Sequence, residues 1–438
     1  MQPLPIREAQ EECPCATAGH FLRGVAARVA RAPLRAILLV GCVSLLAGCG
    51  TVDSITRGVT GLFDDEEQTP EAAAATKAAR KLAQPAELGE FLITHRPREL
   101  WSASVGGGTD GRYLRLRPVL DHGRVFAAEF DGDVFALTLE GGRRLWSMDT
   151  QTHVTGGPGV GEGLVVVGSR DGEITALSAD QGAVLWRAQV TSEVLAEPAV
   201  GLGVVVVRSA DGKVFGLDAG DGRRRWSYDR IVPTLSLRGS SAPVIAGSIV
   251  MIGFDNGRLV GLDLLEGTSL WEANVGVPRG RTDLERMVDI DGDLTVADGT
   301  LYVASFQGSL GAYDVDTGEV QWTREISSYS GVAVGRDHVF VSDDAGAVWA
   351  IDRSNGEVIW KQEGLRNRST SAPAVVGEHV VVGDFEGYVH WLDVSTGEFA
   401  ARERADSSPV ITAPLVVEDL LLVYTAGGDV TAYGPDEP

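Results

Sequence analysis

The sequence predicts an all-β fold, an eight-bladed β-propeller of four-stranded blades that is closed by an N-terminal strand. Three observations lead to this prediction. Short runs of β-branched residues alternate with Gly and Asp-Gly turns, a turn glycine recurs eight times, and a Trp follows most of these glycines at a constant distance. Such runs are typical of strands joined by tight turns, and a period of about 40 residues is typical of propeller blades.

Residues 1–48 have the pattern of a secretory leader. Arginines between Arg23 and Arg35 precede an apolar run at 36–46, which is the order of the basic and hydrophobic regions of a signal peptide. The run is about half as long as the roughly 20 residues that a membrane-spanning helix needs. It ends in Leu46-Ala47-Gly48-Cys49, which resembles a bacterial lipobox and implies that Cys49 is lipidated. A secreted protein without lipid is the alternative, and the long leader leaves open a start codon further along the chain.

Residues 49–95 are expected to form a flexible tether between the lipidated Cys49 and the propeller, which we place at 96–438. The tether contains an acidic run at 64–67 and an Ala run at 72–75 but few aromatic or β-branched residues. A segment of this composition cannot bury enough apolar surface to fold by itself.

The repeat is clearest in residues 197–226, where a run of four valines, the turn Asp211-Gly212 and Trp226 follow one another. Its short runs predict four strands per unit. The turn glycines are Gly132, Gly172, Gly212, Gly257, Gly308, Gly346, Gly387 and Gly428. The first six are followed, each at the same spacing, by Trp146, Trp186, Trp226, Trp271, Trp322 and Trp360.

The ends of the repeat predict how the ring closes. At the same spacing the seventh glycine leads to Ala401 instead of a Trp, the eighth points beyond the last residue, and Trp101 has no turn glycine before it. The last unit thus lacks a Trp strand, and the Trp101 strand lacks a unit. Both departures are explained if the Trp101 strand completes the last blade. We expect each Trp to pack between neighbouring blades, with its indole N–H on an acceptor. Seven blades with an extra hairpin is the alternative, which the eight glycines disfavour.

The repeat resembles the PQQ-type propeller repeat, in which an Ala-Leu-Asp strand, a Thr-Gly turn and a Trp follow one another, as at 316–322. Three segments, 235–239, 286–291 and 383–388, resemble the BamB family of outer-membrane assembly factors. This resemblance covers the lipobox and about residues 90–438, and it implies a propeller that serves as a scaffold.

Composition and spacing argue against several other functions. A net charge of −23 opposes nucleic-acid binding, which needs clustered Lys and Arg. All four Cys lie at or before Cys49, whereas PQQ-dependent enzymes need adjacent cysteines and a Ca²⁺ site. The seven His lack zinc-binding spacing. Residues 289–293 resemble the start of a Ca²⁺ loop, but Leu294 and Thr300 replace the required Gly and bidentate Glu, so we interpret them as an exposed acidic loop. We predict no enzyme activity, no cofactor and no metal.

Two consecutive connections between blades are long. They run from Trp226 to Gly257 and from Trp271 to Gly308, and both exceed the connection between Trp186 and Gly212. Equivalent connections emerge on one face of a propeller, so we expect these two to lie side by side. The candidate partner-binding residues that they carry are Leu235, Leu237, Arg238, Asp289 and Asp291. Exposed aliphatic side chains bordered by charges are typical of an interface; the alternative is that the two leucines are buried beneath their loop.

The resemblance also implies a partner. In BamB proteins the residues that match these five contact the POTRA domains of BamA. The chain is therefore expected to be a non-enzymatic lipoprotein of the β-barrel assembly (BAM) machinery, which binds BamA and unfolded outer-membrane β-barrel precursors. Gly50 follows Cys49 where an inner-membrane lipoprotein usually has Asp, which implies an anchor in the outer membrane, facing the periplasm. A periplasmic propeller that binds a small molecule or sugar in its central channel is the alternative.

Overall fold

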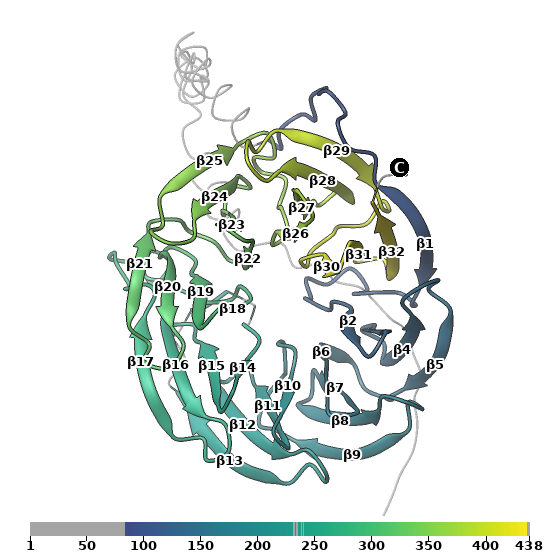
Figure 1. Ribbon diagram of the computed structural model, residues 1–438. Coiled ribbons are helices and arrows are strands. Elements are labelled where there is room, and N and C mark those ends of the chain that lie inside the picture. The colour runs from purple at the N-terminus through teal and green to yellow at the C-terminus, as the bar shows by residue number, and fades with distance from the viewer. Residues whose placement is uncertain (1–83, 231–232, 234, 238, 240, 436–438) are drawn as a thin grey trace, which may run out of the picture. The chain divides into compact units, whose positions relative to one another are not determined.

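The computed structural model describes residues 84–435, apart from 231, 232, 234, 238 and 240. These residues form 32 strands in eight four-stranded antiparallel sheets, which follow one another in a ring around a common axis (Figure 1). The predicted eight-bladed, all-β propeller is thereby confirmed. In the described part of the chain, no helix has the length and apolar character needed to cross a membrane.

The blades are numbered in chain order. Blades 1 to 4 contain β2 (Val119–Asp121), β3 (Arg124–Ala128), β4 (Asp133–Thr138) and β5 (Arg144–Asp149); β6 (Val154–Gly161), β7 (Leu164–Ser169), β8 (Glu173–Ser178) and β9 (Val184–Gln189); β10 (Ala199–Gly201), β11 (Val204–Arg208), β12 (Lys213–Asp218) and β13 (Arg224–Asp229); and β14 (Val244–Ala246), β15 (Ile249–Gly253), β16 (Arg258–Asp263) and β17 (Ser269–Asn274). Blades 5 to 8 contain β18 (Thr295–Ala297), β19 (Thr300–Ala304), β20 (Leu310–Asp314) and β21 (Val320–Arg324); β22 (Val332–Val334), β23 (His338–Ser342), β24 (Val348–Asp352) and β25 (Val358–Gln362); β26 (Ala374–Val376), β27 (His379–Gly383), β28 (Tyr388–Asp393) and β29 (Phe399–Arg404); and β30 (Leu415–Val417), β31 (Leu420–Tyr424), β32 (Asp429–Gly434) and β1 (Arg98–Ser104).

Blade 3 shows how the repeat pattern produces a blade. The valines of β11 are buried on both faces of the sheet, as expected for a strand that lies between two neighbouring blades. Gly212 has a φ of 82° in the turn between β11 and β12, a left-handed conformation that side chains disfavour. On the outer strand β13, residues alternate between exposed and covered, and Trp226 is the buried one.

The Trp residues join each blade to the next, as predicted. The indole N–H of Trp146 in blade 1 donates to the carbonyl of Ala179 in blade 2 (3.1 Å), and Trp186 in blade 2 donates to Ala219 in blade 3 (2.8 Å). Each indole also lies on a glycine of the neighbouring turn, so that a Cβ atom on Gly182 would be 2.6 Å from the Trp146 ring. Seven of the eight junctions are built in this way.

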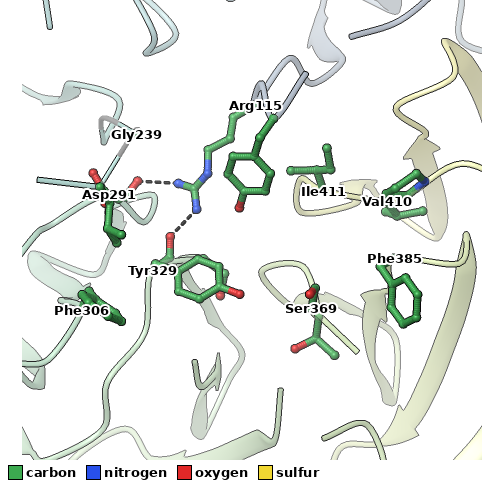
Figure 2. A pocket seen from close by; sticks show the side chains of 14 residues that line it. Arg115, Gly239, Asp291, Phe306, Tyr329, Ser369, Phe385, Val410 and Ile411 are labelled. Atoms are coloured by element: carbon green, nitrogen blue, oxygen red, sulfur yellow. Dashed lines mark hydrogen bonds between the residues drawn. The ribbon is translucent and has the colours of Figure 1, made fainter. Parts of the chain in front are cut away.

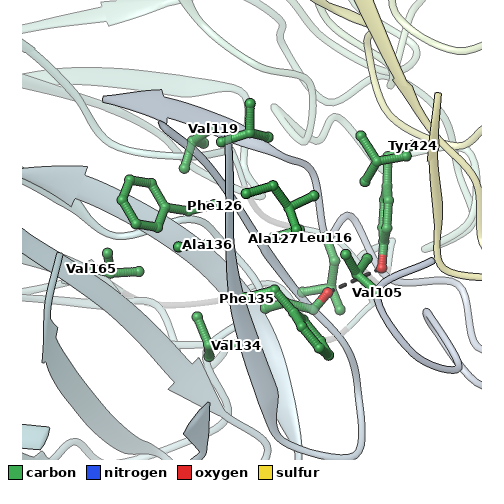
Figure 3. Close-up of a cluster of buried hydrophobic side chains, with 14 of the residues drawn as sticks. Val105, Leu116, Val119, Phe126, Ala127, Val134, Phe135, Ala136, Val165 and Tyr424 are labelled. Atoms are coloured by element: carbon green, nitrogen blue, oxygen red, sulfur yellow. Dashed lines mark hydrogen bonds between the residues drawn. The ribbon is translucent and has the colours of Figure 1, made fainter. Parts of the chain in front are cut away.

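The predicted closure is confirmed by the order of strands in blade 8, which is β1-β32-β31-β30. The indole N–H of Trp101 donates to the Leu139 carbonyl of blade 1 (2.9 Å). A buried cluster then continues from blade 8 into blade 1, and within it the Tyr424 hydroxyl donates to the Ala128 carbonyl (3.1 Å; Figure 3).

The eighth junction, between blades 7 and 8, is different. Elsewhere the outer-strand Trp is the register partner of an Ala or Gly on the third strand. In blade 7 the large and the small residue have exchanged strands: the Trp, Trp391, is on the third strand β28, and its register partner Ala401 is on the outer strand β29. Blade 8 takes its fourth strand from β1, so no turn connects its third and fourth strands. There is consequently no turn glycine on which a Trp at 401 could pack.

Residues 84–97, which we call the strap, lie against blades 6 and 7. The Ala86 N–H donates to the Arg366 carbonyl (2.8 Å), and the Thr94 N–H donates to the Ala400 carbonyl (3.0 Å). The Phe91 and Phe399 rings are 5.5 Å apart. The end of the expected tether, residues 84–95, is therefore not a free spacer, because its backbone and apolar side chains find partners on the propeller that composition alone does not reveal.

Candidate functional site

The two long connections form the candidate site. The first docking loop, residues 230–243, joins blades 3 and 4, and the second docking loop, residues 275–294, joins blades 4 and 5. The backbone N–H of Leu237 donates to the carboxylate of Asp289 (2.5 Å), and a Cβ atom on Gly239 would be 3.0 Å from the Asp291 carboxylate. The prediction that the two loops lie side by side is confirmed.

The five predicted residues are not equally placed. Leu235 is 42% exposed, and Leu237 is half-buried. Arg238 lies outside the described residues, as does Cys49. Asp289 and Asp291 are 0% and 3% exposed. The expectation of an exposed acidic loop is wrong, because the second docking loop turns these carboxylates inward, beneath the first.

The carboxylates lie near a second buried pair. Arg208, at the end of the valine run of β11, forms a buried ion pair with Asp255. Loss of solvent raises the pKa of Asp289 to about 6 and that of Asp291 to about 7, with Asp255 adding to both shifts and Arg208 opposing them. Among the described residues, one oxygen of Asp289 and both oxygens of Asp291 have no hydrogen-bond partner. Such groups are costly to bury alone, so this part of the site can gain from a polar partner.

A cavity of about 470 Å³ opens beside the loops, and Leu237, Gly239 and Asp291 form part of its lining. Its lining includes the aromatic residues Tyr113, Phe306, Tyr329 and Phe385. Figure 2 shows the last three of these rings in the cavity wall. Arg115 crosses the cavity wall and donates hydrogen bonds to the main-chain carbonyls of Asp291 and Tyr329 (Figure 2). The cavity is therefore mostly apolar, and residues of both docking loops form part of its wall.

A second polar cluster links the connections before blades 1, 3 and 5. The Arg117 guanidinium donates to Glu197 of the connection before blade 3 (Nε to Oε2, 2.6 Å) and to Asp293 of the second docking loop (Nη1 to Oδ2, 3.1 Å). The two carboxylates raise the pKa of Arg117, and burial raises the pKa of Glu197 even beside Arg117. In the described ranges, no group of three or more His, Cys, Asp or Glu side chains is placed to hold a metal ion.

Sequence reasoning did not identify Arg115, Arg117 or Arg208. For Arg115 and Arg117 the sequence contained a usable signal, because Leu114 and Leu116 alternate with them. In an extended segment, successive side chains point to opposite faces. For Arg208 the signal was a cation directly after four valines, since a charge on a buried strand requires a buried partner.

Comparison with known proteins identifies the family. The family model described as outer membrane protein assembly factor BamB matches residues 130–362 and 363–437. The BamB of Pseudomonas aeruginosa is 49% identical over 296 residues, which are 68% of this chain and 78% of that protein. The BamB of Xanthomonas campestris pv. campestris is 41% identical over 399 residues, 89% of this chain and 94% of that protein.

Solved structures agree with this result. The crystal structure of BamB from Moraxella catarrhalis has a TM-score of 0.71 and 30% identity, and the match covers 77% of this chain and all of that one. A europium-containing methanol dehydrogenase has a TM-score of 0.65 at 13% identity, which shows a shared fold alone. The chain belongs to the BamB family of outer-membrane protein assembly factors.

Proposed function

We propose that this chain is a non-enzymatic scaffold of the β-barrel assembly machinery, which binds the POTRA domains of BamA through its two docking loops. The observation that carries the proposal is the arrangement of these loops. They pack on each other through the Leu237 N–H and Asp289, Leu235 is half-exposed, and Leu237 lines the apolar cavity. Exposed and half-buried aliphatic side chains beside an apolar cavity are typical of the centre of a protein interface.

The scaffold is proposed to be attached to the outer membrane through a lipid on Cys49 and to face the periplasm. Because the strap binds blades 6 and 7, residues 84–95 would not serve as a flexible part of the tether. A propeller held in this way beside BamA would orient the POTRA domains for incoming β-barrel precursors. Precursors could also add to exposed blade edges as further strands.

The test is recovery of BamA from detergent-solubilised membranes with the tagged full-length protein. The variant Leu235→Ala with Leu237→Ala should reduce recovery by about tenfold or more, as expected when central apolar contacts of an interface are removed. The matched control is Leu185→Ala with Leu270→Ala, which removes two exposed leucines of the outer strands β9 and β17 and should leave recovery unchanged.

Thermal unfolding of each variant completes this test. Equal unfolding temperatures with selective loss of BamA support the proposal. Normal recovery of BamA by the Leu235 and Leu237 variant would contradict it. Recovery of no BamA by the wild type, together with a bound small molecule, would favour a ligand-binding propeller instead.

The burial of the acidic residues changes how their role can be tested. Replacing Asp289 by Ala removes the acceptor of the Leu237 N–H and would act by disturbing the first docking loop. Asp289→Asn can keep an acceptor oxygen for the Leu237 N–H, while it removes the charge and replaces the other carboxylate oxygen by an NH2 group. We therefore expect Asp289→Asn to retain more BamA binding than Asp289→Ala, measured by the same recovery assay.

A further inference from the structure

The connection that follows the closing strand reaches from the ring-closure junction to the second docking loop. We call residues 105–118 the spoke. Its base is fixed to blades 8 and 1, because the Val105 N–H donates to the Gly428 carbonyl (2.7 Å) and the Gly108 carbonyl accepts from the Phe130 N–H (2.8 Å). The start of the spoke is thus attached to both sides of the junction that β1 closes.

The side chains of the spoke alternate. Leu114 and Leu116 are buried in the cluster that joins blades 8 and 1, and Arg115 and Arg117 extend to the other side. This alternation follows from the period of two in an extended chain. The leucines hold the segment on the core, so the arginines leave from a fixed base.

Arg115 and Arg117 contact the second docking loop at two points. Arg115 donates one hydrogen bond to the Asp291 carbonyl and another to the Tyr329 carbonyl of the connection before blade 6. Arg117 forms an ion pair with Asp293, two residues further along the loop, at 3.1 Å. A guanidinium is a rigid, planar fork of donors, so Arg115 fixes the separation of the two connections that it joins.

The other side of the loop is held by neighbouring blades. The Ile290 N–H donates to the Phe254 carbonyl (3.3 Å), and the Asp289 carbonyl accepts from the Phe306 N–H (2.8 Å). Toward the channel, the Asp291 side chain has no hydrogen-bond partner among the described residues. On that side the loop is therefore held by the Arg115 hydrogen bond to the Asp291 main chain, by the ion pair of Arg117 with Asp293, and by the backbone bridge between Asp293 and Gly331.

We propose that the spoke sets the position of the second docking loop, with Arg115 as a positioning residue, so that partner docking depends on closure of the ring by β1. This proposal rests on the docking function proposed above. Arg115 acts through the loop and does not itself need to contact the partner.

The first test compares hydrogen–deuterium exchange of the full-length wild type with that of Arg115→Met. Amides of residues 287–294 should exchange about tenfold faster in the variant, the effect expected when a charge-assisted hydrogen bond to a loop is lost. BamA recovery should fall by a similar factor, while amides of the blade strands remain unchanged. Arg115→Lys, which can still donate to one carbonyl, should restore part of both.

The matched control is Arg324→Met. Arg324 also donates to main-chain carbonyls, those of Asn355 and Gly356 at the outer turn of blade 6 and that of the adjacent Thr323. Its replacement should leave exchange at 287–294 and BamA recovery as in the wild type.

The dependence on ring closure is tested with Trp101→Ala, which loosens β1, and with Trp186→Ala, which removes the equivalent Trp from blade 2. Exchange at 287–294 should accelerate in the Trp101 variant and not in the Trp186 variant. Equal acceleration in both would overturn the dependence on closure.

Unchanged exchange at 287–294 in Arg115→Met would overturn the positioning role. Faster exchange with undiminished BamA recovery would show that loop position does not govern docking, and it would also overturn the proposal. If the wild type itself recovers no BamA, the docking function fails, and the exchange difference still decides whether the spoke positions the loop.

Discussion

The exchanged Trp and Ala of blade 7 provide a direct test of how the propeller is held together. The double variant Trp391→Ala with Ala401→Trp gives blade 7 the arrangement of the other blades, with the Trp on the outer strand. If the Trp position mattered only within a sheet, this variant would be as stable as the wild type. If the Trp needs a turn glycine on the next blade, the exchange must destabilise the protein, because blade 8 has no such turn.

The expected cost follows from burial. Trp391 is 1% exposed, and Tyr433 of blade 8 contacts it edge to face at 5.4 Å. Loss of a buried Trp typically costs about 3–5 kcal/mol. A Trp at 401, where Ala401 is 2% exposed, adds about 1–3 kcal/mol of overpacking. The two residues are neighbours and their effects do not simply add, so we expect a net loss of about 3–6 kcal/mol in the free energy of unfolding.

Urea-induced unfolding followed by far-UV circular dichroism measures this change. A double variant within about 0.5 kcal/mol of the wild type, the range of an ordinary surface substitution, would refute the reasoning. The control is the opposite exchange in blade 6, Trp360→Ala with Ala350→Trp. It loses the 2.8 Å hydrogen bond from Trp360 to the Val394 carbonyl and should also be destabilised.

Four other changes test the closure, the channel cluster, the buried acid and the anchor. Deleting 97–105 removes β1 and Trp101 and should cost at least about 3–5 kcal/mol in urea unfolding; an unchanged midpoint would contradict closure by β1. Arg117→Met leaves two carboxylates unpaired, and because its side chain is 32% exposed we expect about 1–3 kcal/mol, less than for a fully buried pair, also from urea unfolding. The pKa of Asp291 is raised from 3.8 to about 7 in the folded state, so the free energy of unfolding decreases as the pH rises through that range. In Asp291→Asn this decrease should be smaller by up to about 4 kcal/mol. Parallel curves of stability against pH for the variant and the wild type would be the contrary result. Cys49→Ala should abolish lipidation, and mass spectrometry that finds an unacylated mature terminus elsewhere in the wild type would disprove the role of Cys49.

The blade architecture was predictable because each blade is specified by a short sequence pattern that recurs along the chain. The spacing from Gly132 to Trp146 recurs with little change, and each repeat buries the same positions against its neighbours. The orphan strand of Trp101 was informative for the same reason, since only a strand from the other end of the chain could complete blade 8. Even the missing Trp at 401 was visible as a departure from the pattern, although its cause was not.

The candidate site was predictable only in part. Loop length indicated correctly that the two docking loops lie together, and Leu235 is exposed as an interface residue should be. The acidic residues were misjudged, because an Asp-rich loop is usually solvated and nothing local shows that another loop covers it. The strap was misjudged for a related reason, since its partners on blade 7 lie near the opposite end of the sequence.

The sequence by itself determined the number of blades, the closing strand and the Trp junctions, because each depends on contacts between elements with fixed spacing. Only the tertiary structure decided which groups meet across the ring. Arg117 and Asp293 are far apart in the sequence and belong to connections with no common period, yet they form an ion pair. Their contact exists because ring closure brings the irregular loops of opposite blades to one axis, where a charged group that has lost water is stabilised by a partner of opposite charge.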